Sequence, residues 1–234
     1  MNLAIIGAGE SSRIKAEGLK GSKHLIKING ESLIERIIRI AKQNGANKVF
    51  CIINEHEPEL KNFLSNHDFG IPFRLIVKST PSSMHSLFSL APYLKKEPFC
   101  LATTDSVFLE SEYSEFLSYS ILQEDVVDGT LGITRYIDDE KPLCVAMDED
   151  DTIIKFSDSK EGYNWATGGI YFFSPTIFDE IESALEIGIA RLRNFLRLLV
   201  SKGYILKGFS FSKIIDVDHL SDIAKAESLI KGIE

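Results

Sequence analysis

Long hydrophobic runs are missing from this 234-residue sequence: no apolar run approaches the roughly 18 residues that a transmembrane helix needs. A signal peptide is not expected either, because Glu10 and Arg13 interrupt the apolar N-terminal stretch almost at once. The three cysteines lie far apart and form no CxxC pair, so neither a zinc site nor a redox motif is indicated. We therefore expect a cytoplasmic protein with no membrane partner and with buried thiols.

An excess of positive charge is also missing, since the formal net charge is -8. A protein that neutralises many phosphates of a nucleic acid needs clustered lysine and arginine. The balance of charge therefore argues against a nucleic-acid partner. It leaves room for a small phosphorylated ligand, which needs only a few local cations.

Short apolar runs alternate with amphipathic stretches through the first half of the chain. Four runs have the length of buried strands: 3–6, 49–53, 73–77 and 99–103. Three stretches between them show helical spacing of apolar residues: 31–45, 58–67 and 82–94. This alternation predicts an α/β fold of three layers, in which helices cover both faces of a mostly parallel sheet.

The second half has a different pattern, typical of antiparallel strands. Strands are expected within 129–136, 143–157 and 167–174, with the acidic run 148–151 as an exposed hairpin turn. Helices are expected over 174–186 and 189–203, and a strand leading into a helix over 214–230. No Pro/Gly/Ser-rich linker and no internal repeat divides the chain, so we predict a single domain with a mixed sheet.

The opening stretch LAIIGAGESSR is a strand-like run followed by a glycine-bearing loop and an arginine. A dinucleotide-binding fingerprint needs a third glycine where Ser12 stands. It also needs an acidic residue at the end of the second strand, whereas Glu31 precedes a helix. The loop after Gly7 runs to about residue 30, while that fold enters its helix at once. An NAD(P)-dependent oxidoreductase is therefore disfavoured.

The longer stretch GAGESSR…SKHLIKINGESLIERII resembles the opening of the nucleotidyltransferase family, which includes sugar-nucleotide pyrophosphorylases and phosphocholine cytidylyltransferases. The family pattern is Gly/Ala-Ala-Gly-x-Gly-x-Arg, then Pro-Lys-x-Leu and Gly-x-Pro-Leu-Ile. The matching residues, in order, are Ala8, Gly9, Arg13, Lys23, Leu25, Gly30, Leu33 and Ile34. Ser11 departs from a family glycine, and Ser22 and Ser32 depart from family prolines. Weaker resemblances at 82–94, 99–109, 153–175 and 214–229 extend the match over nearly the whole chain.

The resemblance implies a Rossmann-like, GT-A-like nucleotidyltransferase fold, with residues 1–125 as the nucleotide-binding half and 126–234 as the acceptor-binding half. It implies a Mg²⁺-dependent enzyme that transfers a nucleotidyl group from an NTP to a sugar 1-phosphate or a phosphocholine-like phosphate, releasing pyrophosphate. A non-catalytic module that binds a nucleotide or sugar nucleotide is the alternative, because Ser11 and Ser22 depart from the family pattern. The base, the acceptor and the oligomeric state stay open.

The resemblance also assigns site residues. Arg13 is expected at the β- and γ-phosphates and Lys23 at the α-phosphate, as catalytic cations. Alanine at either position is expected to lower turnover and leave the fold intact. The expected nucleotide-binding residues are Ala8, Gly9, Glu10, Ser11, Ser12, Ser83, Ser86 and Thr104.

Acceptor-binding residues are expected at Asp158, Thr167 and Gly168. Asp158 stands where the family has a sugar-binding glutamate, and the altered neighbours Ser159 and Lys160 favour an acceptor other than common hexose phosphates. The ending DVDHLSD resembles the cytidylyltransferase branch and favours the same conclusion.

Two aspartates each close an apolar stretch and are the predicted metal ligands. Asp105 follows the run 99–103, and Asp216 follows KII. Mg²⁺ is commonly held by one or two carboxylates together with phosphates and water, so the two strand ends should lie within about 5 Å. Asp218 is a competing second ligand. Without metal the two carboxylates should repel, so Asp105→Asn is expected to leave the apo protein at least as stable as the wild type.

Overall fold

The computed structural model describes residues 1–7 and 12–232, and for Ser12 the backbone alone. The predicted nucleotide contacts Ala8, Gly9, Glu10 and Ser11 therefore lie outside the described residues, as does the side chain of Ser12. No helix within these ranges is both long and apolar enough to cross a membrane. Cys51, Cys100 and Cys144 are all buried and carry free thiols.

The first half forms a parallel sheet in the order β6-β1-β4-β5. Its strands are β1 (Asn2–Gly7), β4 (Lys48–Ile53), β5 (Phe73–Val77) and β6 (Phe99–Thr103). Strands β1, β4 and β6 are buried on both faces, as parallel strands flanked by helices require, whereas the edge strand β5 is only partly buried. The four predicted strands are confirmed within one residue at each end.

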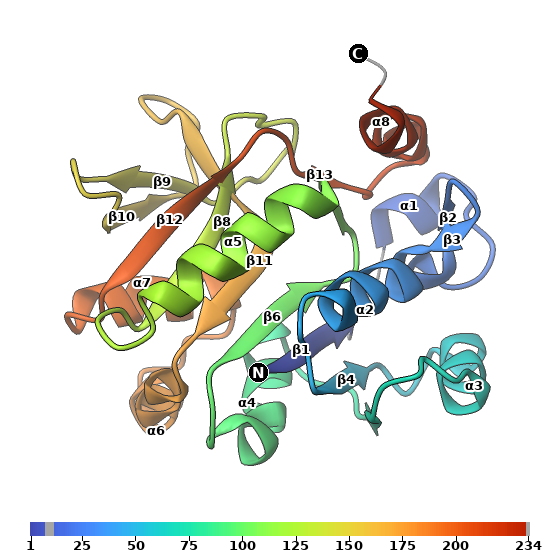
Figure 1. The fold of residues 1–234 in the computed structure, drawn as a ribbon, viewed down its shortest axis with the longest axis horizontal. Coiled ribbons are helices and arrows are strands. Elements are labelled where there is room, and N and C mark those ends of the chain that lie inside the picture. Colours follow the sequence, from blue (N-terminus) through green and yellow to red (C-terminus); the bar gives the residue numbers. More distant parts are fainter. Residues whose placement is uncertain (8–11, 233–234) are drawn as a thin grey trace.

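Strand β11 joins the two halves of the chain into one nine-stranded mixed sheet (Figure 1). It runs antiparallel to β6 on one side and to β8 on the other, with Ile170 opposite Ala102. The strands of this half are β8 (Gly129–Thr134), β9 (Cys144–Met147), β10 (Ile153–Ser157), β11 (Trp165–Phe173) and β12 (Leu206–Phe211). The acidic run 148–151 forms the turn between antiparallel β9 and β10, as predicted.

Helices cover both faces of the sheet and give the three layers predicted from the alternating pattern. One face packs on α4 (Ser83–Leu94), η2 (Pro175–Glu180), α6 (Ile181–Glu186) and α7 (Leu192–Ser201). The other face packs on α2 (Leu33–Gln43), α3 (Pro58–Asn66) and α5 (Glu110–Leu122). Alternate residues of β1 serve the two cores, since Ala4 belongs to the first and Leu3 to the second.

Ser32 shows why a departure from the family proline is tolerated at the start of α2. Its hydroxyl accepts from the Glu35 backbone N–H, and the Glu35 carboxylate accepts from the Ser32 backbone N–H. This capping box satisfies two donors that a helix start otherwise leaves unpaired. Ser32 therefore stabilises the start of α2 as its N-cap.

A small cluster of short elements lies beside the carboxyl ends of β1 and β6. It contains α1 (Ser12–Ala16), η1 (Lys23–Leu25), β2 (Lys27–Ile28), β3 (Glu31–Ser32), β7 (Ser106–Val107), β13 (Ile215–Asp216) and α8 (Leu220–Lys231). Their buried residues form a third core that includes Ile14, Ile28 and Val217. The segment from Gly7 to about residue 30, predicted as one long loop, thus contains α1 and η1.

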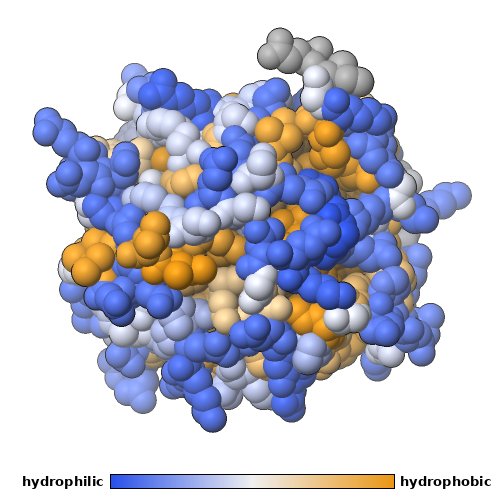
Figure 2. All heavy atoms as spheres, in the orientation of Figure 1, coloured by the Kyte–Doolittle hydropathy of each residue, from blue (hydrophilic) through white to orange (hydrophobic). Residues whose placement is uncertain are grey.

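The face seen in Figure 2 is mostly hydrophilic, with separate hydrophobic patches. Several exposed apolar side chains lie near the end of α5 and the start of β12: Ile121, Leu122, Val126 and Ile205. Single exposed apolar residues are ordinary on protein surfaces. The site described next lies elsewhere, at the carboxyl ends of the strands.

Candidate active site

The carboxyl ends of β1 and β6 lie next to each other, with Ile6 opposite Thr103. Ligands of open α/β sheets collect at this edge, because several loops start there side by side. Thr104 and Asp105 follow β6 directly, as the apolar run 99–103 predicted. Whatever binds between these two strand ends therefore meets the start of the glycine loop and Asp105.

Asp105 and Asp216 are brought together by the short antiparallel pair β7–β13. Asp216 lies opposite Ser106 in this pair, and the Val217 N–H donates to the Asp105 carbonyl at 3.0 Å. The chain separates these aspartates by more than a hundred residues, yet their backbones are neighbours. The structure thus joins the two strand ends that the sequence singled out, and their shared metal stays a prediction.

Lys23 lies between two carboxylates. Its side chain is almost fully buried, and its Nζ is 2.7 Å from Asp105 Oδ2 and 2.6 Å from Asp218 Oδ1. Burial works against the charged ammonium, but the charges of Asp105 and Asp218 outweigh this effect and raise the pKa of Lys23. Lys23 is therefore a fixed cation in this structure.

Arg13 reaches the same aspartate from α1. Its Nη1 lies 2.7 Å from Asp218 Oδ2 and 3.4 Å from Asp139 Oδ1, and its side chain is 41% exposed. The two predicted catalytic cations therefore meet at Asp218. Arg13 is free to contact solvent and ligands, whereas Lys23 is enclosed.

The two strand-end aspartates differ in pKa. Burial alone would raise the pKa of Asp105, but Lys23 outweighs it and lowers the pKa to about 2. Burial, and then the charge of Asp105, raise the pKa of Asp216 to about 7. Asp216 has a hydroxyl partner in Ser106, whose Oγ donates to Oδ1 at 2.7 Å. The repulsion expected between the two carboxylates therefore raises the pKa of Asp216 and leaves Asp105 ionised.

This distribution of charge corrects the expectation for Asp105→Asn. Asp105 is held as a carboxylate by the buried Lys23, so the substitution removes a favourable ion pair. A gain in apo stability is therefore expected from Asp216→Asn instead. The sequence showed two strand-end aspartates but not which of them the lysine would contact.

Gly169 allows the close packing behind the two aspartates. Its φ is +73°, and a Cβ there would lie 2.4 Å from both Ser106 Oγ and Thr103 Oγ1. These two hydroxyls are 3.0 Å apart, and Ser106 contacts Asp216. A side chain at Gly169 would therefore displace the hydroxyls that support Asp216.

Gly169→Ala is expected to lower the free energy of unfolding by about 2–4 kcal/mol, from backbone strain and the two short contacts together. Urea unfolding would measure this loss. Gly162→Ala is the matched control, because Gly162 has a φ of +78° but nothing within 4 Å of its added Cβ. Equal losses in the two variants would mean that the contacts with Thr103 and Ser106 cost nothing.

Three cavities open around these residues. An inner hollow of about 250 Å³ is lined by residues that include Gly7, Lys23, Ser83, Thr104 and Asp105. An open cleft of about 530 Å³ continues from it and is lined by Asp105, Asp216, Ser83, Arg191 and Arg193, among others. A side pocket of about 200 Å³ adjoins both and shares Arg13 and Asp218 with them. The three cavities therefore lie next to one another around the strand ends.

The predicted nucleotide-binding residues differ in whether they line a cavity. Ser83 lines the inner hollow and the open cleft, and its hydroxyl accepts from the Leu192 N–H at 3.3 Å. Thr104 lines the inner hollow and contacts His24. Ser86 is buried, with its hydroxyl 2.6 Å from Thr80 Oγ1. The structure brings Ser83 and Thr104 to the site and keeps Ser86 inside the α4 packing.

The predicted acceptor-binding residues also differ in whether they line a cavity. Thr167 and Gly168 line the side pocket from β11. Asp158 is 60% exposed and pairs with Arg193 at 2.6 Å and Arg197 at 2.8 Å. It lines none of the three cavities found among the described residues. The structure therefore places Asp158 in ion pairs with α7, beside an arginine that lines the open cleft, and its contact with an acceptor stays a prediction.

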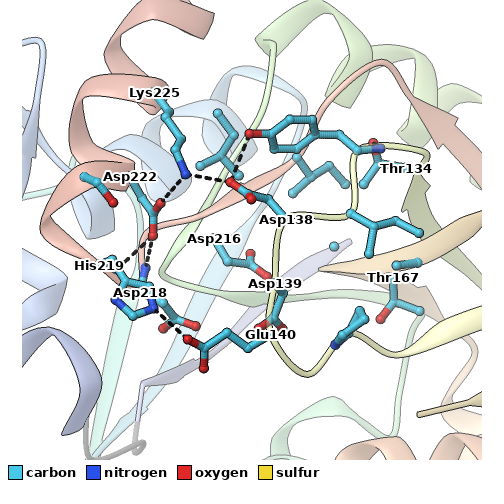
Figure 3. Close-up of a pocket in the computed structure, with 18 of the residues that line it drawn as sticks. Thr134, Asp138, Asp139, Glu140, Thr167, Asp216, Asp218, His219, Asp222 and Lys225 are labelled. Atoms are coloured by element: carbon cyan, nitrogen blue, oxygen red, sulfur yellow. Dashed lines mark hydrogen bonds and ion pairs between the residues drawn. The ribbon is translucent and has the colours of Figure 1, made fainter. Parts of the chain in front are cut away.

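Figure 3 shows that the side pocket lies between the loop after β8 and the start of α8. Lys225 of α8 pairs with Asp138 of the loop at 2.6 Å and with Asp222 at 3.0 Å. His219 faces Glu140 at 3.8 Å. The pocket is thus rich in carboxylates and is closed by ion pairs between two segments far apart in sequence.

Several of these residues were missed from the sequence. Arg191 and Arg193 begin α7 and line the open cleft, and the pair Asp138–Lys225 lines the side pocket. Two arginines spaced by one residue at the start of a predicted helix were an available signal. For Asp138 and Lys225 no local pattern marks the partnership, because it depends on the packing of α8.

Curated proteins of similar sequence are nucleotidyltransferases and a related transferase. A low-salt glycan biosynthesis nucleotidyltransferase of Haloferax volcanii is 22% identical over 219 residues, which cover 88% of this chain and 59% of the relative. A bifunctional IPC transferase and DIPP synthase of Aquifex aeolicus is 24% identical over 239 residues, covering 98% and 53%. The chain thus spans a little over half the length of these curated relatives.

A solved structure shows the same fold. The inositol-1-phosphate CTP transferase of T. maritima superposes with a TM-score of 0.82 at 22% identity, covering 100% of this chain and 97% of the other. The family model described as Nucleotidyl transferase matches residues 3–232. With the match extending from β1 to the end of α8, the chain belongs to the nucleotidyl transferase family.

Proposed function

We propose that this chain is a Mg²⁺-dependent enzyme that transfers a nucleotidyl group from an NTP to a small phosphorylated acceptor and releases pyrophosphate. The observation that carries the proposal is the convergence of Lys23 and Arg13 with Asp105 and Asp216 at adjoining strand ends. The two cations can bind phosphate groups, and the two carboxylates can bind a divalent metal ion. The family resemblance supports the same reaction.

In this reaction an oxygen of the acceptor phosphate attacks the α-phosphorus of the NTP. A new P–O bond forms as the bond to the β-phosphate oxygen breaks, and that oxygen leaves with pyrophosphate. The attacking oxygen is already anionic at neutral pH, so no general base is needed. The protein instead holds two anions together and neutralises the charge that develops on the leaving group.

Lys23 and Arg13 are suited to different parts of that task. Lys23 is enclosed and held by Asp105 and Asp218, which suits a cation aimed at the reacting α-phosphate. Arg13 is more exposed and lines all three cavities, which suits a planar donor to the β- and γ-phosphates. Ser83 and Thr104 add hydroxyls to the inner hollow.

Asp105 and Asp216 fit a magnesium ion that is bound together with the triphosphate. Within residues 1–7 and 12–232, no three acidic, histidine or cysteine side chains converge as a ready metal-ligand set. The charge of Asp105 nevertheless raises the pKa of Asp216. A cation bound between the two carboxylates would relieve this repulsion. Mg²⁺ commonly takes its remaining ligands from phosphates and water, and when bound it would neutralise phosphate charge.

The open cleft and side pocket provide a place for the acceptor. Arg191 and Arg193 line the same cleft as Asp216, and Arg193 also pairs with Asp158; both arginines are suited to the acceptor phosphate. The body of the acceptor would occupy the side pocket beside Thr167, Gly168 and Tyr136. We propose a phosphocholine-like phosphate or a sugar or polyol phosphate other than the common hexose phosphates. Robust activity with glucose 1-phosphate and UTP or dTTP would contradict this choice.

Binding of the donor gives the first test. Thermal shifts with four NTPs, with and without Mg²⁺, should show one base that stabilises the protein most and does so with the metal. A ligand at about 100 times its dissociation constant adds roughly 2.7 kcal/mol to the free energy of unfolding. Asp105→Asn should remove the Mg²⁺-dependent part of the shift. Equal shifts with and without Mg²⁺ would contradict the metal assignment.

A further inference from the structure

His24 is a buried polar residue that the proposed reaction has not used. It follows Lys23 in η1, is 5% exposed and lines the inner hollow. Its Nδ1 contacts the hydroxyl of Thr104. Its Nε2 is buried and forms no well-aligned hydrogen bond among the described residues, although the Gly7 backbone acts as a weak partner of the ring.

The imidazole of His24 lies where three parts of the site meet. A Cβ added to Gly7 would lie 3.4 Å from His24 Cε1 and 3.6 Å from Nε2, so the ring packs directly against the end of β1. Thr104, whose hydroxyl contacts Nδ1, directly precedes Asp105. Lys23 is the next residue along the chain. One ring therefore touches the start of the glycine loop and the segment that carries Asp105.

Packing alone does not account for histidine at this position. Burial lowers the pKa of His24, so the ring is neutral near pH 7 and has one N–H and one acceptor nitrogen. A buried nitrogen without a well-aligned hydrogen bond costs free energy, and an apolar side chain of similar size would avoid that cost. The contact with Thr104 is what the imidazole supplies and a leucine could not.

We propose that His24 is a positioning residue, which holds the Thr104 hydroxyl and the Thr104–Asp105 segment in place against Lys23 and the end of β1. It acts through Thr104 and touches no reacting atom. Small displacements matter here, because Lys23 and Asp105 must both keep their places relative to the α-phosphate. The inference rests on the proposed nucleotidyl transfer.

Three substitutions separate positioning from packing. Asparagine can place an amide where Nδ1 lies, glutamine places its amide near Nε2, and leucine fills the volume without polar atoms. We expect His24→Leu and His24→Gln to lower kcat roughly 10- to 100-fold, with the acceptor KM nearly unchanged. His24→Asn should recover most of kcat. Steady-state kinetics at a temperature where every variant is folded would measure this.

Ile28→Val is the control for a general loss of stability near the site. Ile28 is buried in the third core and lies outside the proposed reaction machinery. It should lower the midpoint of thermal unfolding and keep full kcat. If His24→Leu likewise lowers only the unfolding midpoint and keeps full kcat, His24 is a packing residue and the proposal is wrong.

A double-mutant cycle tests the route through Thr104. Thr104→Val removes the hydroxyl at nearly constant volume. If His24 acts through that hydroxyl, His24→Leu with Thr104→Val should have nearly the kcat of the slower single variant. If the fold-losses in kcat of the two single variants multiply in the double variant, the proposed route through Thr104 is wrong.

A measurement without turnover keeps the two proposals distinguishable. The imidazole ¹⁵N resonances of His24 should shift in Thr104→Val, because Nδ1 loses its partner, and unchanged resonances would overturn the contact. A wild type that releases no pyrophosphate would overturn the proposed function and this inference with it. A wild type that turns over beside a fully active His24→Leu overturns only the inference.

Discussion

Replacing Lys23 with alanine is expected to slow nucleotidyl transfer by about 10²–10³-fold, the usual loss when one preorganised donor to a transition-state charge is removed. The reason is that Lys23 is nearly buried and aimed by two carboxylates, so water cannot take over its role. Pyrophosphate release, measured under conditions where the variant is folded, would show the loss. Near-normal release would remove Lys23 from the mechanism.

The same substitution is expected to destabilise the protein, which differs from the expectation based on sequence. Without the ammonium, Asp105 loses its ion-pair partner and Asp218 keeps only Arg13. A loss of about 2–4 kcal/mol in the free energy of unfolding follows, somewhat below that for a fully buried pair because both carboxylates are partly exposed.

Two controls separate stability from catalysis in the Lys23 variant. Adding Asp218→Asn to Lys23→Ala should restore part of the stability, since one repelling charge is removed, but none of the turnover. Lys61→Ala on the exposed side of α3 should change neither quantity. If the double variant regained turnover, the loss would have come from repulsion and not from a missing cation.

Asp216→Asn is the second substitution with a large expected effect, and it should act in opposite directions on stability and activity. In the absence of Mg²⁺ it removes a carboxylate whose ionisation is opposed by burial and by Asp105. The free energy of unfolding should rise by about 1–3 kcal/mol at pH 8. Turnover and the Mg²⁺-dependent part of NTP binding should be lost.

The pH dependence of apo stability follows from the raised pKa of Asp216. The folded state binds this proton more tightly than the unfolded chain, because the pKa is about 7 in the first and 3.8 for the free group. Its contribution to stability is therefore fully present below about pH 4 and is lost as the pH rises through about 7. Urea unfolding between pH 5 and pH 8 should show this decline in the wild type and not in Asp216→Asn.

Metal binding should show the reverse dependence. Mg²⁺ competes with the proton on Asp216, so its affinity should weaken as the pH falls below about 7. Asp105→Asn with Asp216→Asn should turn over little more slowly than either single variant, since both serve one ion. If Asp218→Asn abolished metal dependence and Asp216→Asn did not, the second ligand would lie two residues further along.

Much of the fold was available from the sequence because its signals are local. The runs 49–53 and 99–103 are apolar throughout, as a strand buried on both faces requires, and they match β4 and β6. Helix α5 and strand β12 were not identified. In α5 serine and glutamate alternate with aromatic residues and blur the helical spacing, and β12 mixes glycine and serine into a short strand.

The site was predictable to the extent that its residues end apolar runs or match a motif. Asp105 and Asp216 were located by the strands they close, and Lys23 and Arg13 by the resemblance to the family motif. The contacts among them were not, because Lys23 meets Asp105 across 82 positions and Asp218 across 195. No local pattern fixes such pairs, and none indicated the ion pair between Asp158 and Arg193.

The most direct test of the central claim is ³¹P NMR of the chain with NTP, Mg²⁺ and a phosphorylated acceptor. The account predicts pyrophosphate together with an equal amount of a new diphosphate diester joining nucleotide and acceptor, with neither formed by Lys23→Ala at a comparable rate. Tight, Mg²⁺-dependent NTP binding with no pyrophosphate for any phosphocholine-like, polyol or sugar phosphate would contradict it. The chain would then be a nucleotide-binding module on a nucleotidyl transferase fold.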